Sequence, residues 1–260
     1  MSDIKEPHAT HREVELLDTL RSEGGSARTA RLAEMLNVSE ETVRRTVKAL
    51  AKAGRVERVH GGVYLSNTEA LSPVGLRLET RTAEKLAIAR EVARQIPSGS
   101  SVFLDVGSTT AFVAEALAAH KDLTIITNGL HAANALAAQG THRVFFAGGE
   151  LLPDIGGTVG KGAIEFVTQF SIDTAVFSID GVDLNSGFLL TVSSEADLAR
   201  AVAARAQRTI VACDSAKFGS RAPIVAFPTG CVDLVVSDQP LAPAFTTQFA
   251  LWEVEAIIAP

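Results

Sequence analysis

The segment LDVGSTT, residues 104–110, places one acid, one glycine and three hydroxyl side chains directly after an apolar run. A helical stretch follows, so Ser108, Thr109 and Thr110 would present their hydroxyls and backbone N–H groups at the N-terminus of a helix. The helix dipole and the unpaired N–H groups at that end favour a bound anion. The segment therefore predicts a phosphate-binding site.

Comparable polar residues follow four later apolar runs, in the segments TNG (127–129), GGE (148–150), DGVD (180–183) and DSAK (214–217). In parallel α/β sheets, the loops at the carboxyl ends of the strands converge on one ligand site. Lys217 would supply a positive charge for the phosphate. The hydroxyls of a polyol would be bound by the carboxylates of Asp105, Asp180 and Asp183 and by the amide of Asn128. The predicted effector site comprises Asp105, Gly107, Ser108, Thr109, Thr110, Asn128, Asp180, Gly181, Asp183, Glu195 and Lys217.

Each of these residues also has an ordinary structural role. Asn, Asp, Ser and Gly make turns and helix caps, and Glu195, in SSEADLA, would stabilise a helix from its first turn. Five loops in the same position relative to their strands favour a shared ligand, a small phosphorylated sugar or polyol. Cys213 and Cys231 have neither CxxC spacing nor a disulfide framework, so we expect buried, reduced thiols. No metal site and no cofactor are expected.

The elements that must position these residues alternate between strand and helix from residue 83 onward. Runs typical of strands are SVFLDV, LTIIT, RVFFA, TAVFSI, RTIVAC and LVVS, several of them separated by helical stretches. This alternation predicts an α/β domain over residues 83–260, with a mostly parallel sheet covered on both faces. The C-terminal run ALWEVEAIIA would be a last strand or part of a subunit interface. Residues 66–82 are polar and lack a strong period, which predicts a connector.

A different chemistry is indicated near the N-terminus, where residues 44–58 hold six basic side chains and one acid, Glu57. The whole chain carries a net charge of −6, whereas residues 1–65 hold 11 basic and 10 acidic residues. A basic stripe on an acidic protein is typical of a small DNA-binding domain. A solvated helix face would explain the stripe if it stood alone.

The elements around the stripe have the order of a winged helix-turn-helix domain, over residues 8–65. Three short helices are predicted, the third capped by Ser39, and RVERVHGGVYL then alternates like a hairpin wing. The apolar helix positions expected to form the core are Val14, Leu17, Leu20, Leu32, Met35, Leu36, Val43, Val47 and Leu50. The predicted DNA-binding residues are Ser39, Thr42, Arg44, Arg45, Lys48, Arg58, His60, Gly61 and Gly62.

The stretch LAEMLNVSEETVRRTVKALAKAGRVERVHGG resembles the N-terminal head of the DeoR family of bacterial transcriptional regulators. That family's pattern is a leucine-rich second helix, Val-Ser, Thr-Ile-Arg-Arg-Asp-Leu, a glycine and a His-Gly-Gly wing. The matching residues are Thr42, Arg44, Arg45, His60, Gly61 and Gly62. Thr46 stands where the family usually has Asp, a departure that bears on base readout rather than on phosphate contact.

The motifs LDVGSTT, TNG, AGGE, GGTVG, SIDGVD, SSEADLA and DSAKFG resemble the DeoR-type sensor domain in matching order, from about residue 75 to 238. This resemblance implies a Rossmann-like sheet similar in fold to ribose-5-phosphate isomerase, a phosphorylated sugar as ligand, and loss of DNA binding as the outcome. AGGELLPDIGGTVG with IEFVTQFSID resembles the glycerol-3-phosphate repressor branch most. Ser178 departs from the family's usual glycine ahead of Asp180.

Three functions fit these patterns: a DNA-binding repressor controlled by a sugar or polyol phosphate, a sugar-phosphate isomerase-like enzyme, and a DNA-binding protein with a vestigial, ligand-free domain. The enzyme is disfavoured because LNSGFLLTVSSE has no Lys after the acids and a shared fold does not transfer activity. We therefore expect a repressor without enzymatic activity, with glycerol 3-phosphate as the leading effector.

The expected partners are double-stranded operator DNA, the effector, and further copies of the chain in a homodimer or homotetramer, because two half-sites require two heads. The polar N-terminus MSDIKEPHATHREVE has no apolar core of a secretion signal. No run approaches the roughly 18–20 apolar residues of a membrane span. A cytoplasmic protein with no membrane partner is expected.

Overall fold

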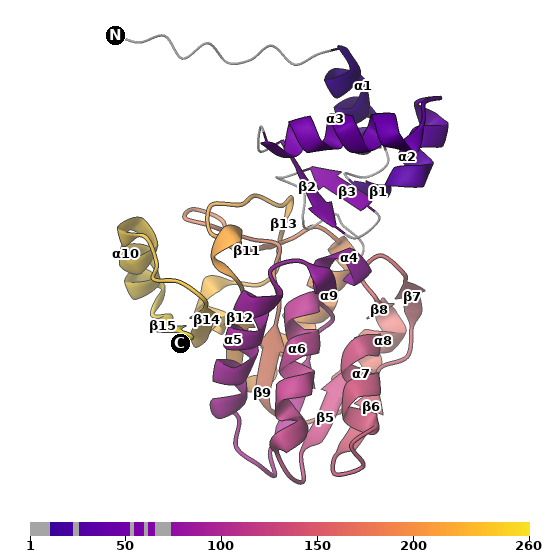
Figure 1. Ribbon diagram of the computed structural model, residues 1–260. Helices are drawn as coiled ribbons and strands as arrows, with labels where there is room; N and C mark the ends of the chain where they lie inside the picture. The colour runs from indigo at the N-terminus through magenta and orange to yellow at the C-terminus, as the bar shows by residue number, and fades with distance from the viewer. Residues whose placement is uncertain (1–10, 23–25, 53–54, 60–61, 66–73) are drawn as a thin grey trace. The chain divides into compact units, whose positions relative to one another are not determined.

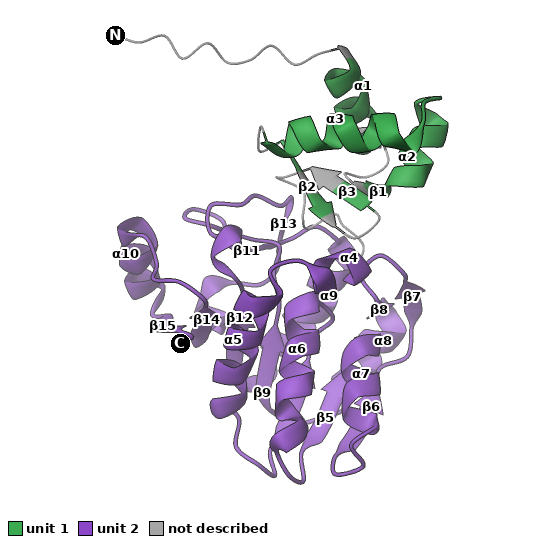
Figure 2. Ribbon diagram, viewed as in Figure 1, with its two compact units in different colours: residues 1–72 green, residues 73–260 purple. Residues whose placement is uncertain are grey.

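The computed structural model describes residues 11–22, 26–52, 55–59, 62–65 and 74–260 (Figure 1). The chain divides into two compact units, residues 1–72 and 73–260 (Figure 2). Each unit buries a hydrophobic core of its own, so each can be understood from its own sequence.

In its described residues, the first unit contains three helices and a small antiparallel sheet. The helices are α1 (His11–Ser22), α2 (Thr29–Met35) and α3 (Glu40–Lys52), and the strands are β1 (Ser26–Arg28), β2 (Val56–Val59) and β3 (Gly62–Leu65), in the order β1-β3-β2. The three helices and the β2–β3 hairpin follow the predicted order. Strand β1 was not expected, because a three-residue strand is too short to show a period; it is fixed by pairing with β3.

The core of this unit corrects two expectations. Val43, Val47 and Leu50 are buried on one face of α3, as their spacing predicted. Val14, however, is 43% exposed, and Leu16 is buried in its place beside Leu17 and Leu20. Met35 is also exposed, and α2 instead buries Leu32 and Ala33. Both errors arise because neighbouring apolar residues fit more than one helical face, and tertiary packing chooses between them.

The second unit is built on a seven-stranded sheet in which all neighbouring strands are parallel, in the order β15-β14-β12-β9-β4-β5-β6. Its strands are β4 (Ser101–Leu104), β5 (Thr124–Thr127), β6 (Arg143–Phe146), β9 (Ile172–Phe177), β12 (Ala206–Ala212), β14 (Leu234–Ser237) and β15 (Glu255–Ile258). The predicted parallel α/β architecture is confirmed. The run ALWEVEAIIA was expected to form a last strand or part of a subunit interface, and in the structure its second half forms the last strand, β15.

Helices cover both faces of this sheet because the strands are apolar on both sides. Val102 and Leu104 pack in one core, which also contains residues of α5 (Thr82–Arg94), α6 (Ser108–Ala116) and α7 (Leu130–Ala137). Phe103, between them, points into the other core, with α8 (Lys161–Val167), α9 (Ser193–Ala203) and α10 (Pro243–Trp252). In Figure 1, α5, α6 and α7 lie in front of the sheet.

Short elements crowd the carboxyl edge of the sheet. These are α4 (Val74–Glu79), the hairpin of β7 (Glu150–Leu152) and β8 (Gly157–Val159), the hairpin of β10 (Gly181–Asp183) and β11 (Gly187–Leu190) with β13 (Ile224–Val225), and the 3-10 turn η3 (Ser215–Lys217). Two further 3-10 turns are η2 (Leu117–Ala119) and η4 (Thr229–Cys231). α4 and the start of α5 lie inside the stretch 66–82 expected to be a connector. Among the helices of the described ranges, none is long and apolar enough to cross a membrane.

Candidate functional site

Helix α3, the predicted recognition helix, begins at a defined cap. The Thr42 N–H donates to Ser39 Oγ at 3.2 Å, and the hydroxyls of these two residues are 2.9 Å apart. Thr46 donates its hydroxyl to the Thr42 carbonyl at 3.0 Å, so this replacement of the family's usual Asp bonds to its own helix. The cap fixes where the helix starts and therefore which side chains project from its first turns.

The exposed face of α3 carries Arg44, Arg45 and Lys48, opposite the buried valines and leucine. Arg44 is held on this face by two acids of the first turn, Glu40 at 2.8 Å and Glu41 at 3.6 Å. All three side chains of this cluster are about half exposed or more, and such pairs contribute only about 0–1 kcal/mol. A DNA phosphate or base edge can therefore replace the acids at little cost.

The wing supplies the remaining predicted DNA contacts. Arg58 is exposed on β2, and Gly62 begins β3 opposite Val59. His60 and Gly61 lie outside the described residues. The predicted DNA-binding residues that the structure describes therefore lie on one helix and one hairpin, the two elements that a winged helix-turn-helix places on DNA.

Replacing Arg44 or Arg45 with Ala is expected to weaken operator binding by about 1–3 kcal/mol for each base that the missing guanidinium would have recognised. The effector affinity of the second unit should not change. Fluorescence-anisotropy titration of labelled operator DNA at fixed salt measures the effect, with Arg205→Ala, an exposed arginine of the second unit, as the matched control. Wild-type binding by both α3 variants would show that α3 is not the recognition helix.

At the carboxyl edge of the second unit, Asp105 follows β4 and is 1% exposed. Within the described ranges, neither of its carboxylate oxygens has a hydrogen-bond partner. The nearby Val106 N–H donates to Asn128 Oδ1 at 3.0 Å, and one of the two N–H groups of Asn128 Nδ2 donates to the Thr158 carbonyl at 3.1 Å. Burial raises the pKa of Asp105 to about 8; Val106 N–H and Asn128 lower it in part, and the Asp180 charge adds to the rise.

Beside Asp105, residues 107–110 form the N-terminus of α6. Gly107 has φ +149°, and a Cβ there would overlap Ser178 Oγ, which itself donates to the Val106 carbonyl at 3.1 Å. Ala111 N–H makes the first helical hydrogen bond, to the Gly107 carbonyl. The preceding N–H groups, those of residues 108–110, belong to the turn that a helix leaves without internal partners. This is the geometry that binds anions.

The β7–β8 hairpin covers the end of β5. Thr158 N–H donates to the Asn128 carbonyl at 2.9 Å, and the backbone at Gly157 approaches that carbonyl too closely for any side chain. A small pocket beside Asp105 is lined by Val74, Val106, Gly107, Gly129, His131, Ala132, Ile155 and Gly156. Asn128 thus joins the end of β5 to β8 and to the residue that follows Asp105.

A second pair of acids lies near Asp105. Asp180 follows β9; its Oδ2 accepts from Thr191 N–H at 2.8 Å, and its Oδ1 lies 3.8 Å from Arg77 Nη1. Glu195 is buried in the first turn of α9. Burial raises the pKa of Glu195 well above its usual value, the charges of Asp105 and Asp180 raise it further, and Arg77 lowers it. Three carboxyl groups therefore share one neighbourhood with one guanidinium.

Arg77 was not among the predicted site residues because it lies in the segment expected to be a connector. The available signal was the spacing of Arg77, Arg81 and Lys85, four residues apart in LRLETRTAEK. Residues four apart on a helix share a face. An unstructured connector would not be expected to place cations on one helical face. This spacing could therefore have indicated a helix packed against the rest of the unit.

Three other predicted residues lie in neighbouring short elements. Asp183 accepts from the N–H groups of Asn185 and Ser186, which fold the β10–β11 turn and lower the pKa of Asp183. Gly181 begins β10. Lys217 is buried in η3. The side chain of Asp183 thus serves its own hairpin, whereas Asp105, Asn128, Asp180 and Glu195 gather around the end of β4.

A winged helix-turn-helix followed by an α/β unit, with a helix N-terminus and buried acids at its carboxyl edge, is the arrangement of a ligand-responsive DNA-binding regulator. The chain belongs to the DeoR family: residues 12–69 match the DeoR-like helix-turn-helix domain, and residues 80–239 match the DeoR C terminal sensor domain. It is 35% identical over 231 residues to the glycerol-3-phosphate regulon repressor of Escherichia coli, covering 89% of this chain and 91% of that protein.

The chain is also similar to a second repressor and, in part, to a solved structure. The HTH-type transcriptional repressor CsqR of Escherichia coli is 30% identical over 239 residues, covering 92% of both chains. Among solved structures, ribose 5-phosphate isomerase A of Methanocaldococcus jannaschii aligns with 54% of this chain and 55% of its own, at 18% identity and a TM-score of 0.40.

Proposed function

We propose that this chain is a transcriptional repressor that releases operator DNA when a phosphorylated sugar or polyol binds its second unit, with glycerol 3-phosphate as the first candidate. The observation that carries the proposal is Asp105, a buried acid whose oxygens have no hydrogen-bond partner among the described residues, directly beside the N-terminus of α6. The helix end suits a phosphate and the acid suits a hydroxyl of the same molecule. The name of the relative in Escherichia coli suggests glycerol 3-phosphate.

The effector site of this proposal comprises the residues predicted from the sequence, with Arg77 added. Asp105, Asn128, Asp180 and Glu195 would recognise hydroxyls, and residues 107–110 with Arg77 and Lys217 would balance the phosphate. Gly181 and Asp183 would shape the neighbouring hairpin. The repressor would act as a homodimer or homotetramer, because two operator half-sites need two DNA-binding domains. It would act in the cytoplasm.

We also propose that the chain has no isomerase activity. Asp183, the second acid that an isomerase would use, accepts from the amides of its own turn. No lysine stands in residues 184–195, between the second acid and Glu195. Incubation with ribose 5-phosphate should therefore give no ketose above the rate in buffer. Turnover that Asp183→Asn abolishes would replace the repressor proposal with an enzyme.

Thr109→Val and Lys217→Met test the proposed effector site. The first variant removes a hydroxyl from the first turn of α6, and the second removes a buried charge from η3. A hydrogen bond to a charged group contributes about 1.5–3 kcal/mol, so each variant should bind glycerol 3-phosphate roughly ten- to a hundredfold more weakly. Operator binding without effector should match that of the wild type, and calorimetric and anisotropy titrations measure the two affinities.

In cells, both variants should repress even when the effector is present. If Thr109 only stabilises its helix and Lys217 only packs, the variants would melt at lower temperature but release operator DNA at the wild-type effector concentration. That result would remove these two residues from the site.

A further inference from the structure

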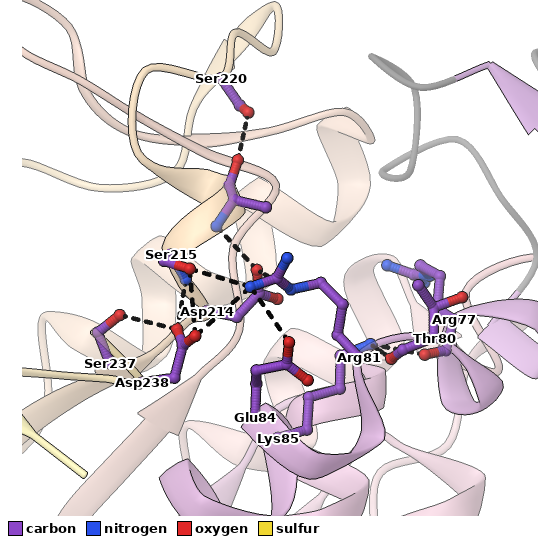
Figure 3. Close-up of polar contacts among 11 residues, drawn as sticks. Arg77, Thr80, Arg81, Glu84, Lys85, Asp214, Ser215, Ser220, Ser237 and Asp238 are labelled. Atoms are coloured by element: carbon purple, nitrogen blue, oxygen red, sulfur yellow. Dashed lines mark hydrogen bonds and ion pairs between the residues drawn. The ribbon is translucent and has the colours of Figure 1, made fainter. Parts of the chain in front are cut away.

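Three cations spaced four residues apart lie at the α4–α5 junction (Figure 3). Arg77, on α4, pairs with Asp180 after β9. Arg81, between the helices, reaches the loops after β12 and β14. Lys85, on α5, is 1% exposed and donates to the carbonyls of Arg77 at 2.6 Å and Thr80 at 2.8 Å. Lys85 therefore holds the C-terminal end of α4 in place.

Arg81 makes the most extensive of these contacts. Its Nε lies 3.0 Å from Asp214 Oδ1, and its Nη2 lies 3.4 Å from Asp238 Oδ2 and donates to Ser215 Oγ at 2.9 Å. Nη2 is also 3.6 Å from Glu84 on the first turn of α5. One guanidinium thus ties two strand-end loops to the start of a helix, a geometry that a planar fork of donors allows and an ammonium does not.

The backbone of Arg81 is as constrained as its side chain. Its φ of +52° and ψ of 42° lie in the left-handed region, which a residue with a Cβ adopts at a cost. This conformation breaks the helical path between α4 and α5. The side-chain contacts of Arg81 and the cap from Lys85 keep the junction in this shape, so the orientation of α4 depends on them.

The loop that Arg81 holds also carries a proposed effector residue. Asp214, Ser215 and Lys217 lie in or directly before η3, and Asp238 braces the same turn by accepting from Ser215 N–H at 2.6 Å. A movement of η3 when Lys217 contacts the effector would displace the partners of Arg81. α4 begins at Val74, the first described residue after the first unit, so a change at the junction would act on the chain that leads to the DNA-binding head.

We infer that Arg81 is the positioning residue that couples effector binding to operator release, by tying η3 and the β14 loop to the α4–α5 junction. The inference rests on the proposed function of the second unit as an effector-binding site. Because coupling is a difference between two affinities for DNA, it can be measured apart from the affinity for the effector.

Arg81→Asn is the main variant, because Asn tolerates the left-handed backbone and removes the guanidinium. Arg81→Lys keeps the positive charge but replaces the planar guanidinium with an ammonium group. Asp238→Asn removes one partner while leaving an acceptor for Ser215 N–H. Arg90→Gln, which removes an exposed charge from the same helix, is the matched control. All are made in the full chain.

The quantity to measure is the ratio of operator dissociation constants with and without glycerol 3-phosphate, at a concentration that saturates each variant by calorimetry. Allosteric ratios typically lie at about 5- to 150-fold. Arg81→Asn should bind both ligands but give a ratio below about threefold, whereas Arg81→Lys and Asp238→Asn should be intermediate and Arg90→Gln should match the wild type. A residue with only a structural role would change the melting temperature or the effector affinity, but not this ratio at saturation.

A wild-type ratio in Arg81→Asn would overturn the inference. If Arg81→Asn does not fold, a wild-type ratio in Asp238→Asn overturns it in the same way, and a reduced ratio there supports it. Failure of the proposed function is distinguishable, because it would be seen in the wild type itself, as no binding or no operator release with glycerol 3-phosphate or any other sugar phosphate.

Discussion

Gly107→Ala is expected to abolish the response to the effector while leaving operator binding unchanged. The φ of +149° at Gly107 is a conformation found essentially only at glycine, and the added Cβ would overlap Ser178 Oγ. The first turn of α6 must then move away from Ser178 and the end of β4. Losing two hydrogen bonds to a phosphate, at about 1.5–3 kcal/mol each, would weaken effector binding more than about a hundredfold.

Two further variants separate the causes of this loss. Gly99→Ala introduces a methyl group at another left-handed glycine, φ +81°, with no atom within 4 Å, so it reports backbone strain away from the site. Gly107→Ala with Ser178→Gly removes the overlap and should recover part of the affinity. Calorimetric titration with glycerol 3-phosphate measures all three. Wild-type effector binding by Gly107→Ala would show that the N-terminus of α6 does not hold the phosphate.

The second large effect is on the pH dependence of stability, through Asp105. Its pKa is about 8 in the folded state against an ordinary value of 3.8, so the folded state retains a proton that the unfolded state loses. The resulting stabilisation is complete below the unfolded pKa and is lost as pH rises through the folded pKa. Linkage gives a loss of about 4 kcal/mol between about pH 5 and pH 8.

Asp105→Asn should remove this contribution and make the effector-free protein more stable than the wild type at about pH 8. Glu195, whose pKa is also raised, leaves a residual slope of the same sign. Urea unfolding across this pH range measures the free energy of unfolding, and Asp122→Asn, at an exposed left-handed position, is the control. Parallel pH profiles for Asp105→Asn and the wild type would show that Asp105 is ionised in the folded protein.

Local sequence patterns determined the architecture of both units. Apolar runs of strand length, separated by helical periods, give a parallel sheet covered on both faces because each strand must bury two sides. In α3 the spacing of Val43, Val47 and Leu50 allows one buried face, and this fixes Arg44 and Arg45 on the other. The GSTT segment predicted a helix N-terminus because its residues directly follow an apolar strand.

The composition of the candidate site was decided by tertiary structure. Arg77 enters it from a segment with no strong period, because pairing with Asp180 and capping by Lys85 order that segment as α4. Asp183 was predicted to face the effector from its motif alone, yet its nearest donors are the amides of its own turn. The β7–β8 hairpin closes over Asn128 through backbone hydrogen bonds that no side-chain pattern records.

The sequence predicted the elements better than the composition of the site because the two depend on interactions of different range along the chain. Periodicity and caps depend on residues three or four apart, which the chain itself holds together. The contacts of Arg81 with Asp214 and Asp238 join residues more than a hundred positions apart, and the exposed Val14 loses its place in the core to Leu16 through packing between helices. The sequence by itself determined the two units and the edge at which the site lies, whereas the three-dimensional packing decided which acids and cations meet there.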